Sequence, residues 1–223
     1  MEIIVNMACG LANRMFQYSY YLYLKQNRYD VQVDFYHSAK LAHEKVEWNG
    51  IFPKAKIEQA SFLDVFKLGG GTDILSKIRR KYLPFLSGVV NMPTAFDAGL
   101  PVKGKKSQYI IGVFQNAEMV ESVEEDVKRC FKFQPFADER NKMLEAEMGA
   151  CESVAIHVRK GNDYMQRIWY QNTCSMDYYK KAIDLIIDKV AVPKFYVFTD
   201  NPDWVRENFK DIEYTLVEGN PAS

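Results

Sequence analysis

Val154-Ala-Ile-His157-Val-Arg159-Lys160-Gly161-Asn-Asp163-Tyr164 is the stretch of this sequence that says most about its fold. Its first half is short, apolar and rich in β-branched residues, which is typical of a parallel strand covered on both faces. The strand ends in a histidine, two cations, a glycine and an acid. In open parallel sheets, ligands bind at the carboxyl ends of the strands. Two adjacent cations at such an end suit a doubly charged anion such as a pyrophosphate.

A second polar cluster ends the next strand along the chain. The apolar run Phe195–Phe198 is separated from the first strand by a loop and a helix, and it finishes at Thr199 and Asp200. A strand–helix–strand unit of this length is normally parallel and right-handed, so both strands end at the same edge of the sheet. We therefore expect His157 and Arg159 to face the same crevice as Thr199 and Asp200.

Each of these side chains has a functional and a structural interpretation. Arg159 offers a planar fork for phosphate oxygens, with Lys160 adding a point charge, or else it forms a structural ion pair with Asp163. Asp163 can instead accept a hydrogen bond from a ribose or a base. Asp200 can accept from a ribose diol or a guanine edge, or it can cap the helix that follows. His157 alternates with apolar neighbours, so it points to the opposite sheet face or is a core histidine. The pattern alone indicates an anion or nucleotide site.

The beginning of the chain predicts another α/β unit. The segments Ile3–Val5 and Val31–Phe35 are typical of strands, and the residues from Leu11 to about Lys25 have the spacing of a helix between them. Tyr109–Phe114 is a further candidate for a buried strand. Glu118 to about Phe131 has the pattern of one acidic amphipathic helix.

The remaining segments are less regular. Between residues 37 and 107, three consecutive glycines mark a break, after which Thr72 or Asp73 can cap a basic helix that runs through Tyr82. The polar run from 138 to 150 predicts a helix or a linker between the two halves. Further along, Ser175 is placed to cap a helix that Pro193 ends, and another helix is expected at 203–209.

Composition excludes several classes of protein. The 223 residues are 48% hydrophobic and carry a formal net charge of zero, which argues against duplex nucleic acid as a partner. No apolar run approaches the roughly 20 residues of a membrane span, and no signal peptide precedes the first strand, so we expect a cytoplasmic protein. The sequence shows neither an acidic metal cage nor the paired spacing of zinc or redox cysteines; its cysteines are Cys9, Cys130, Cys151 and Cys174.

Four segments of the sequence match short motifs, in order along the chain. The segment Gly10-Leu-Ala-Asn13-Arg14-Met15-Phe16-Gln17-Tyr18 resembles G-x-x-N-Q-M-F-Q-Y, and Ile111-Gly-Val-Phe-Gln115 is similar to G-Y-F-Q. The segment from His157 to Tyr164 resembles H-x-R-R-G-D-Y, and Phe198-Thr-Asp200-Asn201 resembles F-S-D-D. Together, the four segments resemble the motifs of bacterial α-1,2-fucosyltransferases, glycosyltransferase family 11.

This sequence departs from the family pattern at three positions. Arg14 stands where glutamine is usual, Ala12 stands where glycine is usual, and Asn162 is an insertion before Asp163. The protein O-fucosyltransferase branch of the same superfamily also carries an extra residue before the acid. The family normally continues beyond the point where this sequence stops, with a strand–helix region that helps to hold the donor nucleotide.

The resemblance implies an α/β fold of GT-B type, with two Rossmann-like halves. Residues 1–145 would form the acceptor-side domain. Residues 146–223 would form a donor domain for GDP-fucose that is incomplete at its C-terminus. The implied reaction is an inverting, metal-independent transfer of L-fucose from GDP-β-L-fucose to the 2-hydroxyl of a galactose-containing glycan, with no cofactor other than this donor.

The resemblance also assigns roles to individual residues. Arg159 would stabilise the charge on the departing GDP, because a guanidinium fixed before the reaction suits that charge. Asn13 and Asp163 would be catalytic residues as well. Asn13 would contact Arg159 or the fucose from the amino-terminal side of the cleft, unless it only caps its helix, and Asp163 and His157 are the candidate general bases. The nucleotide would be held by His157, Lys160, Gly161, Thr199 and Asp200.

Three other functions are weighed against this one. A non-catalytic module that binds a GDP-sugar or a glycan would share the anion site, and a fucosyltransferase of another linkage would share the motifs. A Rossmann oxidoreductase is disfavoured, because the first turn lacks the G-x-G-x-x-G pattern that holds a dinucleotide.

Overall fold

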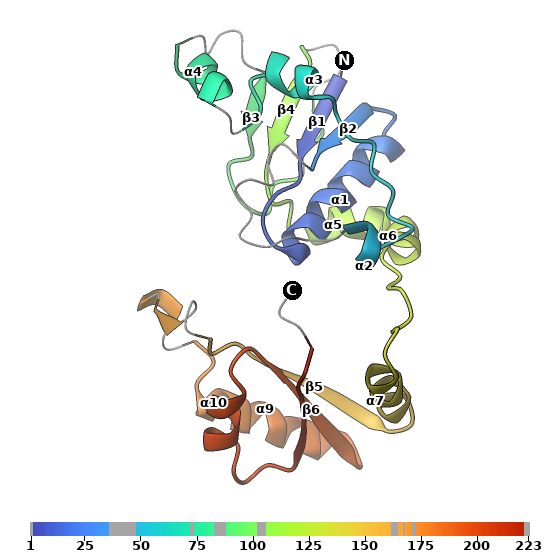
Figure 1. The fold of residues 1–223 in the computed structure, drawn as a ribbon, viewed down its shortest axis with the longest axis vertical. Coiled ribbons are helices and arrows are strands. Elements are labelled where there is room, and N and C mark those ends of the chain that lie inside the picture. The colour runs from blue at the N-terminus through green and yellow to red at the C-terminus, as the bar shows by residue number, and fades with distance from the viewer. Residues whose placement is uncertain are drawn as a thin grey trace. The chain divides into compact units, whose positions relative to one another are not determined.

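The computed structural model describes residues 2–35, 48–71, 74–82, 88–101, 106–161, 165–166, 168–170 and 173–220. The chain forms two compact units, Met1–Gln134 and Pro135–Ala222, and both are α/β units built on parallel sheets (Figure 1). Within the described part of the chain, none of the helices has the length and apolar character that a bilayer crossing requires.

The first unit is built on a sheet of four strands in the order β2-β1-β4-β3 (Figure 1). All neighbouring strands are parallel. β1 lies inside the sheet, where Ile3 pairs with Val31 on one side and with Gln108 on the other. The strands are β1 (Glu2–Asn6), β2 (Asp30–Asp34), β3 (Val89–Asn91) and β4 (Gln108–Ile111).

Helices pack on both faces of this sheet. Ile3 and Val5 belong to the core formed with α1, α5 and α6, whereas Ile4 packs on the opposite face with Val65 of α3. Successive residues of a strand point to opposite faces, so the unbroken apolar run of β1 is buried on both. The helices are α1 (Leu11–Gln26), α2 (Trp48–Ile51), α3 (Phe62–Lys67), α4 (Ile74–Tyr82), α5 (Ala117–Ser122) and α6 (Glu124–Cys130).

Two predicted elements of the first unit are shorter than expected. The expected helix from Glu118 to Phe131 is divided into α5 and α6 at Val123, whose φ of −121° lies outside the helical range. The expected strand Tyr109–Phe114 ends at Ile111, and Phe114 takes a left-handed φ of 58°. The expected caps Thr72 and Asp73 lie outside the described residues.

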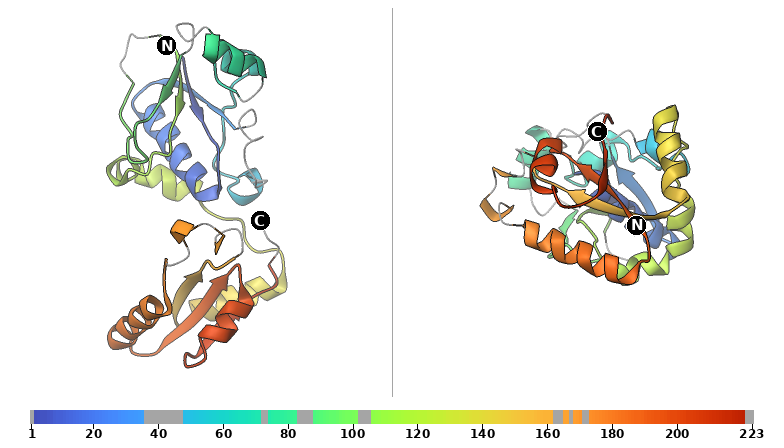
Figure 2. Two further views of the ribbon diagram at one scale, coloured as in Figure 1. Left: turned by 90° about the vertical axis from the view of Figure 1, so that its left-hand side faces the viewer. Right: turned by 90° about the horizontal axis from the view of Figure 1, so that it is seen from below.

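The second unit is built on a sheet of three parallel strands in the order β5-β6-β7 (Figures 1 and 2). Helices α9 and α10 cover one face and share a core with the sheet that includes Val158, Ile183 and Val205. The elements are α7 (Glu139–Gly149), β5 (Glu152–Val158), the 3-10 helix η3 (Ile168–Tyr170), α9 (Met176–Lys189), β6 (Pro193–Thr199), α10 (Pro202–Asn208) and β7 (Tyr214–Val217).

The strand β5 differs from its sequence-based prediction in one respect. Ile156 and Val158 are buried, but Ala155 and His157 are exposed. In the described part of the sheet β5 is an edge strand, and only its α9 side is covered, so the prediction of a strand covered on both faces is wrong. The prediction for α9 is confirmed at its start, where the Ser175 side chain accepts a hydrogen bond from the Tyr178 N–H. Its end differs, because the helix stops at Lys189 and Pro193 begins β6.

Candidate functional site

The carboxyl ends of β5 and β6 lie side by side, as the strand–helix–strand pattern predicts. Val158 pairs with Thr199 at the last position of the ladder. Just beyond it, Asp200 Oδ1 accepts hydrogen bonds from the backbone N–H groups of Lys160, at 2.7 Å, and Gly161, at 2.9 Å. A carboxylate that accepts two backbone N–H groups makes strong, charge-assisted bonds. Asp200 therefore fixes the turn that follows β5.

Asn201 completes this connection. Its Nδ2 donates to the Lys160 carbonyl at 2.9 Å, and its Oδ1 accepts from the Trp204 N–H at 3.1 Å. The Asn201 N–H itself donates to Thr199 Oγ1 at 2.9 Å. Asn201 is thus the N-cap of α10. Asp200 therefore does not cap this helix, which was one of its two interpretations from the sequence.

Arg159 is an exposed cation at this edge. Its side chain is 52% exposed, and its Nε lies 4.0 Å from Asp200 Oδ2. Asp163, the other acid expected beside Arg159, lies outside the described residues. The guanidinium is thus half exposed to solvent and lies beside one oxygen of the Asp200 carboxylate.

Lys160 is buried, in contrast to Arg159. Only 5% of the residue is exposed; its Nζ donates to the Thr173 carbonyl at 2.8 Å and lies 5.3 Å from the centre of the Trp204 ring. These contacts hold the chain segments on either side of the loop that follows β5. The Lys160 ammonium group therefore contacts other groups of the protein, whereas the sequence led us to expect a point charge that binds phosphate.

His157 lies on the face of β5 opposite α9. It is exposed, whereas its neighbours Ile156 and Val158 are buried, so the alternation expected from the sequence is present and the core interpretation is excluded. Its backbone carbonyl accepts a hydrogen bond from the Tyr179 hydroxyl at 3.3 Å.

In the first unit, two segments about a hundred residues apart meet at the carboxyl edge of the sheet. Gln115 Nε2 donates to Asn13 Oδ1 at 3.2 Å. Gln17 Oε1 accepts from the Ala8 N–H, and its Nε2 donates to the Gly112 carbonyl, both at 2.9 Å. α1 is capped at Gly10, so Asn13 lies within the first turn and is not the N-cap. The sequence interpretation named Asn13 alone; Gln17 and Gln115 lie in the same two segments and could have been found there.

Arg14 has a structural role at the same edge of the sheet. The residue is 1% exposed, its Nε donates to the Cys9 carbonyl at 2.8 Å, and its guanidinium lies 4.5 Å from the centre of the Phe35 ring. Cys9 takes a left-handed φ of 73° in the turn between β1 and α1. Arg14 therefore supports this turn from inside the unit.

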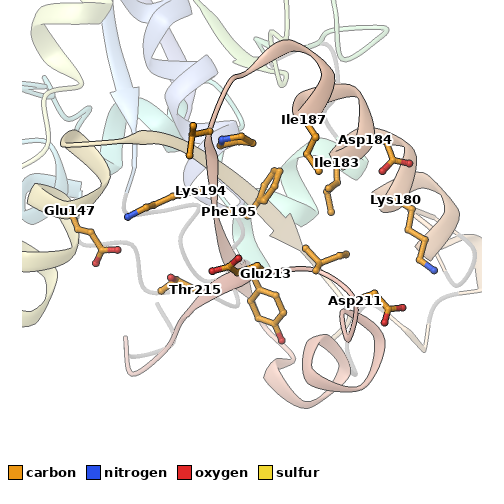
Figure 3. Close-up of a pocket in the computed structure, with 14 residues that line it drawn as sticks. Glu147, Lys180, Ile183, Asp184, Ile187, Lys194, Phe195, Asp211, Glu213 and Thr215 are labelled. Carbon is orange, nitrogen blue, oxygen red and sulfur yellow. The ribbon is translucent and has the colours of Figure 1, made fainter.

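A separate cavity of about 710 Å³ lies at the amino-terminal ends of β6 and β7 (Figure 3). Phe195, Ile183 and Ile187 give it an apolar part, and charged side chains including Lys180, Asp184 and Asp211 surround it (Figure 3). In parallel sheets this is the end opposite to the usual ligand site.

Over the part of the chain that the structure describes, no group of three or more His, Cys, Asp or Glu side chains could hold a metal ion.

Comparison with known proteins points to one family. The model of glycosyl transferase family 11 matches residues 92–223, more than half of the chain. The fold is similar to that of the selenomethionine form of the fucosyltransferase NodZ from Bradyrhizobium, with a TM-score of 0.52, 12% identity, and coverage of 98% of this chain and 78% of that chain. The structure of NodZ alpha-1,6-fucosyltransferase soaked with GDP-fucose gives a TM-score of 0.47 and 11% identity over the same shares. No curated protein sequence matches the chain.

Proposed function

The chain belongs to glycosyltransferase family 11, and from this we propose that it transfers L-fucose from GDP-β-L-fucose to the 2-hydroxyl of a galactose unit in a glycan. The reaction inverts the configuration at the sugar carbon and yields an α-linkage. The observation that carries the proposal is the half-exposed Arg159 side chain at the carboxyl edge of β5, whose Nε lies 4.0 Å from the carboxylate of Asp200.

The proposed role of Arg159 follows from the charge that develops during transfer. As the bond between fucose and the diphosphate breaks, negative charge grows on the departing GDP. A guanidinium that is already oriented stabilises this charge without reorganising at the moment of reaction. We propose that the reaction needs no metal ion or cofactor, because the protein supplies this cation itself.

Other residues of the second unit would bind the nucleotide. Asp200 Oδ2 remains directed toward the Arg159 side of the turn, where a ribose or guanine donor can reach it. Thr199 and Gly161 stabilise the same turn through their hydrogen bonds with Asn201 and Asp200. Lys160 would act indirectly, through its hydrogen bond to the Thr173 carbonyl. His157 is proposed to contact the nucleotide from the exposed face of β5. Asp163 is proposed as a catalytic residue on the strength of the motif alone.

The acceptor would bind to the first unit. The amides of Asn13 and Gln115 are bonded to each other at the carboxyl edge of the sheet, and each keeps polar capacity beyond that bond. Amides both donate and accept, as recognition of a sugar hydroxyl requires. Residues 1–145 would thus serve the galactose-containing acceptor, and residues 146–223 would serve GDP-fucose.

The direct test is to incubate the protein with GDP-fucose and an array of galactose-terminated glycans, followed by linkage analysis of the products. We expect α-linked fucose on the 2-hydroxyl of galactose. Fucose attached at another hydroxyl would overturn the linkage and retain fucosyl transfer. Calorimetric binding of GDP-fucose with no turnover on any acceptor would instead favour a non-catalytic binding module.

A further inference from the structure

A cavity of about 390 Å³ opens on the surface of the first unit beside α5. It is lined by residues of α1, of α5 and of the loop after β3, among them Tyr23, Phe96, Asp97 and Glu118. Neither the anion site of the second unit nor the amide pair Asn13–Gln115 accounts for it.

Phe96 presents an exposed aromatic ring on a fixed loop. The residue is 67% exposed, although phenylalanine is normally buried. Its backbone N–H donates to Thr94 Oγ1 at 3.3 Å, and its carbonyl accepts from Asn116 Nδ2 at 3.1 Å. The loop is tightened further by Asp97 Oδ2, which accepts from the Thr94 N–H at 2.8 Å and from its hydroxyl at 3.0 Å. The backbone that carries the ring is therefore fixed before any ligand arrives, which lowers the entropic cost of binding.

Carboxylates lie around the same cavity. Asp97 uses Oδ2 in the turn, and among the described residues its Oδ1 makes no hydrogen bond. The Glu118 side chain is exposed, and its carboxylate likewise has no hydrogen-bond or ion-pair partner in the described part of the chain. Carboxylates are pure acceptors, so they suit a ligand rich in hydroxyl donors. An aromatic face beside such acceptors suits a neutral sugar, whose C–H face covers the ring while its hydroxyls reach the carboxylates.

The cavity is joined to the proposed acceptor site through the backbone. The Gln115 N–H donates to the Ala95 carbonyl at 2.7 Å, next to Phe96, while the Gln115 side chain holds Asn13. Phe114 fixes this connection: it is fully buried, and its ring stacks on Tyr20 with the centroids 4.0 Å apart. One short, rigid segment thus carries both the amide pair and a wall of the cavity.

We propose that this cavity binds a neutral sugar unit of the acceptor glycan, an inference that rests on the proposed function. Phe96 supplies the stacking face, and Asp97 and Glu118 accept hydrogen bonds from the sugar hydroxyls. The cavity then selects acceptors by their glycan structure, independently of the nucleotide donor.

The kinetic test uses lacto-N-tetraose as acceptor and the variants Phe96→Ala and Glu118→Gln. We expect KM for the tetrasaccharide to rise about three- to tenfold in each variant, with KM for GDP-fucose and the melting temperature unchanged. Tyr82→Ala is the matched control, because Tyr82 on α4 is also an exposed aromatic residue of the first unit, at 66%. The control should keep both KM values.

A binding titration separates failure of this inference from failure of the proposed function. Lacto-N-tetraose is titrated into the protein without donor, and the amide signals are followed by NMR. If wild-type protein transfers no fucose, the proposed function fails, yet loss of tetrasaccharide binding in Phe96→Ala still supports the sugar site. Equal binding by wild-type protein and Phe96→Ala, or a rise in KM for GDP-fucose alone, would overturn the sugar site.

Discussion

The Oδ1 atom of Asp200 lies 2.7 Å from the backbone nitrogen of Lys160, so the residue after β6 directly holds the turn after β5. The same oxygen also accepts from the Gly161 N–H, while Oδ2 faces the Arg159 side chain at 4.0 Å. One carboxylate thus fixes the backbone of the turn and orients the cation that leaves it. These two tasks can be separated by mutation.

Asp200→Asn and Asp200→Ala should lower fucosyl transfer by different amounts. Asparagine keeps an acceptor for the two N–H groups but loses the charge beside Arg159, so we expect kcat to fall about tenfold. Alanine also releases the turn, and we expect a loss of about a hundredfold. Steady-state kinetics with GDP-fucose measures both. Equal losses in the two variants would show that the carboxylate does not act through its hydrogen bonds to the turn.

Arg159→Ala should reduce transfer by at least about a hundredfold, the usual effect of removing one preorganised group that stabilises developing charge. Arg159→Lys should retain part of the activity, because it keeps the charge and loses the planar fork. The fold should be unaffected, since the side chain is half exposed. The control is Arg206→Ala, which removes a similarly half-exposed, ion-paired arginine from the same unit. Near-normal turnover in Arg159→Ala would contradict the proposed role.

The strand order around Arg159 could be predicted because it depends on patterns local to the chain. Two apolar runs joined by a loop and a helix are sufficient to predict parallel strands, and parallel strands bring their carboxyl ends together. The proximity of Arg159 and Asp200 follows from that topology. The cap at Ser175 was likewise visible from residue type and position.

The individual roles of the polar residues could not be predicted in the same way. Asp200 and Asn201 are both good capping residues, and only the backbone geometry assigns the cap of α10 to Asn201. Lys160 is buried because Thr173 and Trp204, both distant in sequence, supply a carbonyl and an aromatic ring. The short strands β3 and β7 carry too few residues for a clear period of two.

The amide pair Asn13–Gln115 should act as one unit in acceptor recognition. We expect Asn13→Ala and Gln115→Ala each to lower kcat/KM for the acceptor, and the double variant to lose less than the sum of the two. The expected coupling energy is about 0.5–1.5 kcal/mol, that of one hydrogen bond between neutral groups. A double-mutant cycle measures it. Additive losses would mean that the two amides contribute independently.

Alkaline pH should destabilise the first unit. Burial raises the pKa of Tyr18, Tyr20 and Tyr109 above the ordinary value of 10.0, and for Tyr109 the nearby Asp34 carboxylate adds to the effect. Above about pH 10 the unfolded chain releases these protons while the folded protein retains them, so the free energy of unfolding falls as the pH rises. Each such tyrosine contributes up to about 1.4 kcal/mol per pH unit.

Urea denaturation between pH 8 and about pH 11 checks this expectation. The stability should change little below about pH 9, and the decline above it should be less steep in Tyr20→Phe, which removes one of these groups. The slope is the informative quantity, because the loss of the hydrogen bond from Tyr20 to the Gly99 carbonyl shifts the baseline at every pH. An unchanged slope in Tyr20→Phe would contradict the assignment for this residue.

Arg14→Gln, which introduces the usual family residue, should destabilise this protein. The guanidinium is buried against Phe35 and bonded to the Cys9 carbonyl, and the shorter, neutral glutamine cannot keep both contacts. We expect a loss of about 1–3 kcal/mol in the free energy of unfolding.

Cys9→Gly should act in the opposite direction, because Cys9 is exposed and its φ of 73° is strained for any residue with a Cβ. A gain of about 0.5–1 kcal/mol is expected. Urea denaturation of the two single variants and of the double variant shows whether Arg14 supports this turn. If it does, the gain in the free energy of unfolding from Cys9→Gly should change when Arg14 is replaced. If the two effects simply add, Arg14 stabilises the unit without acting on Cys9.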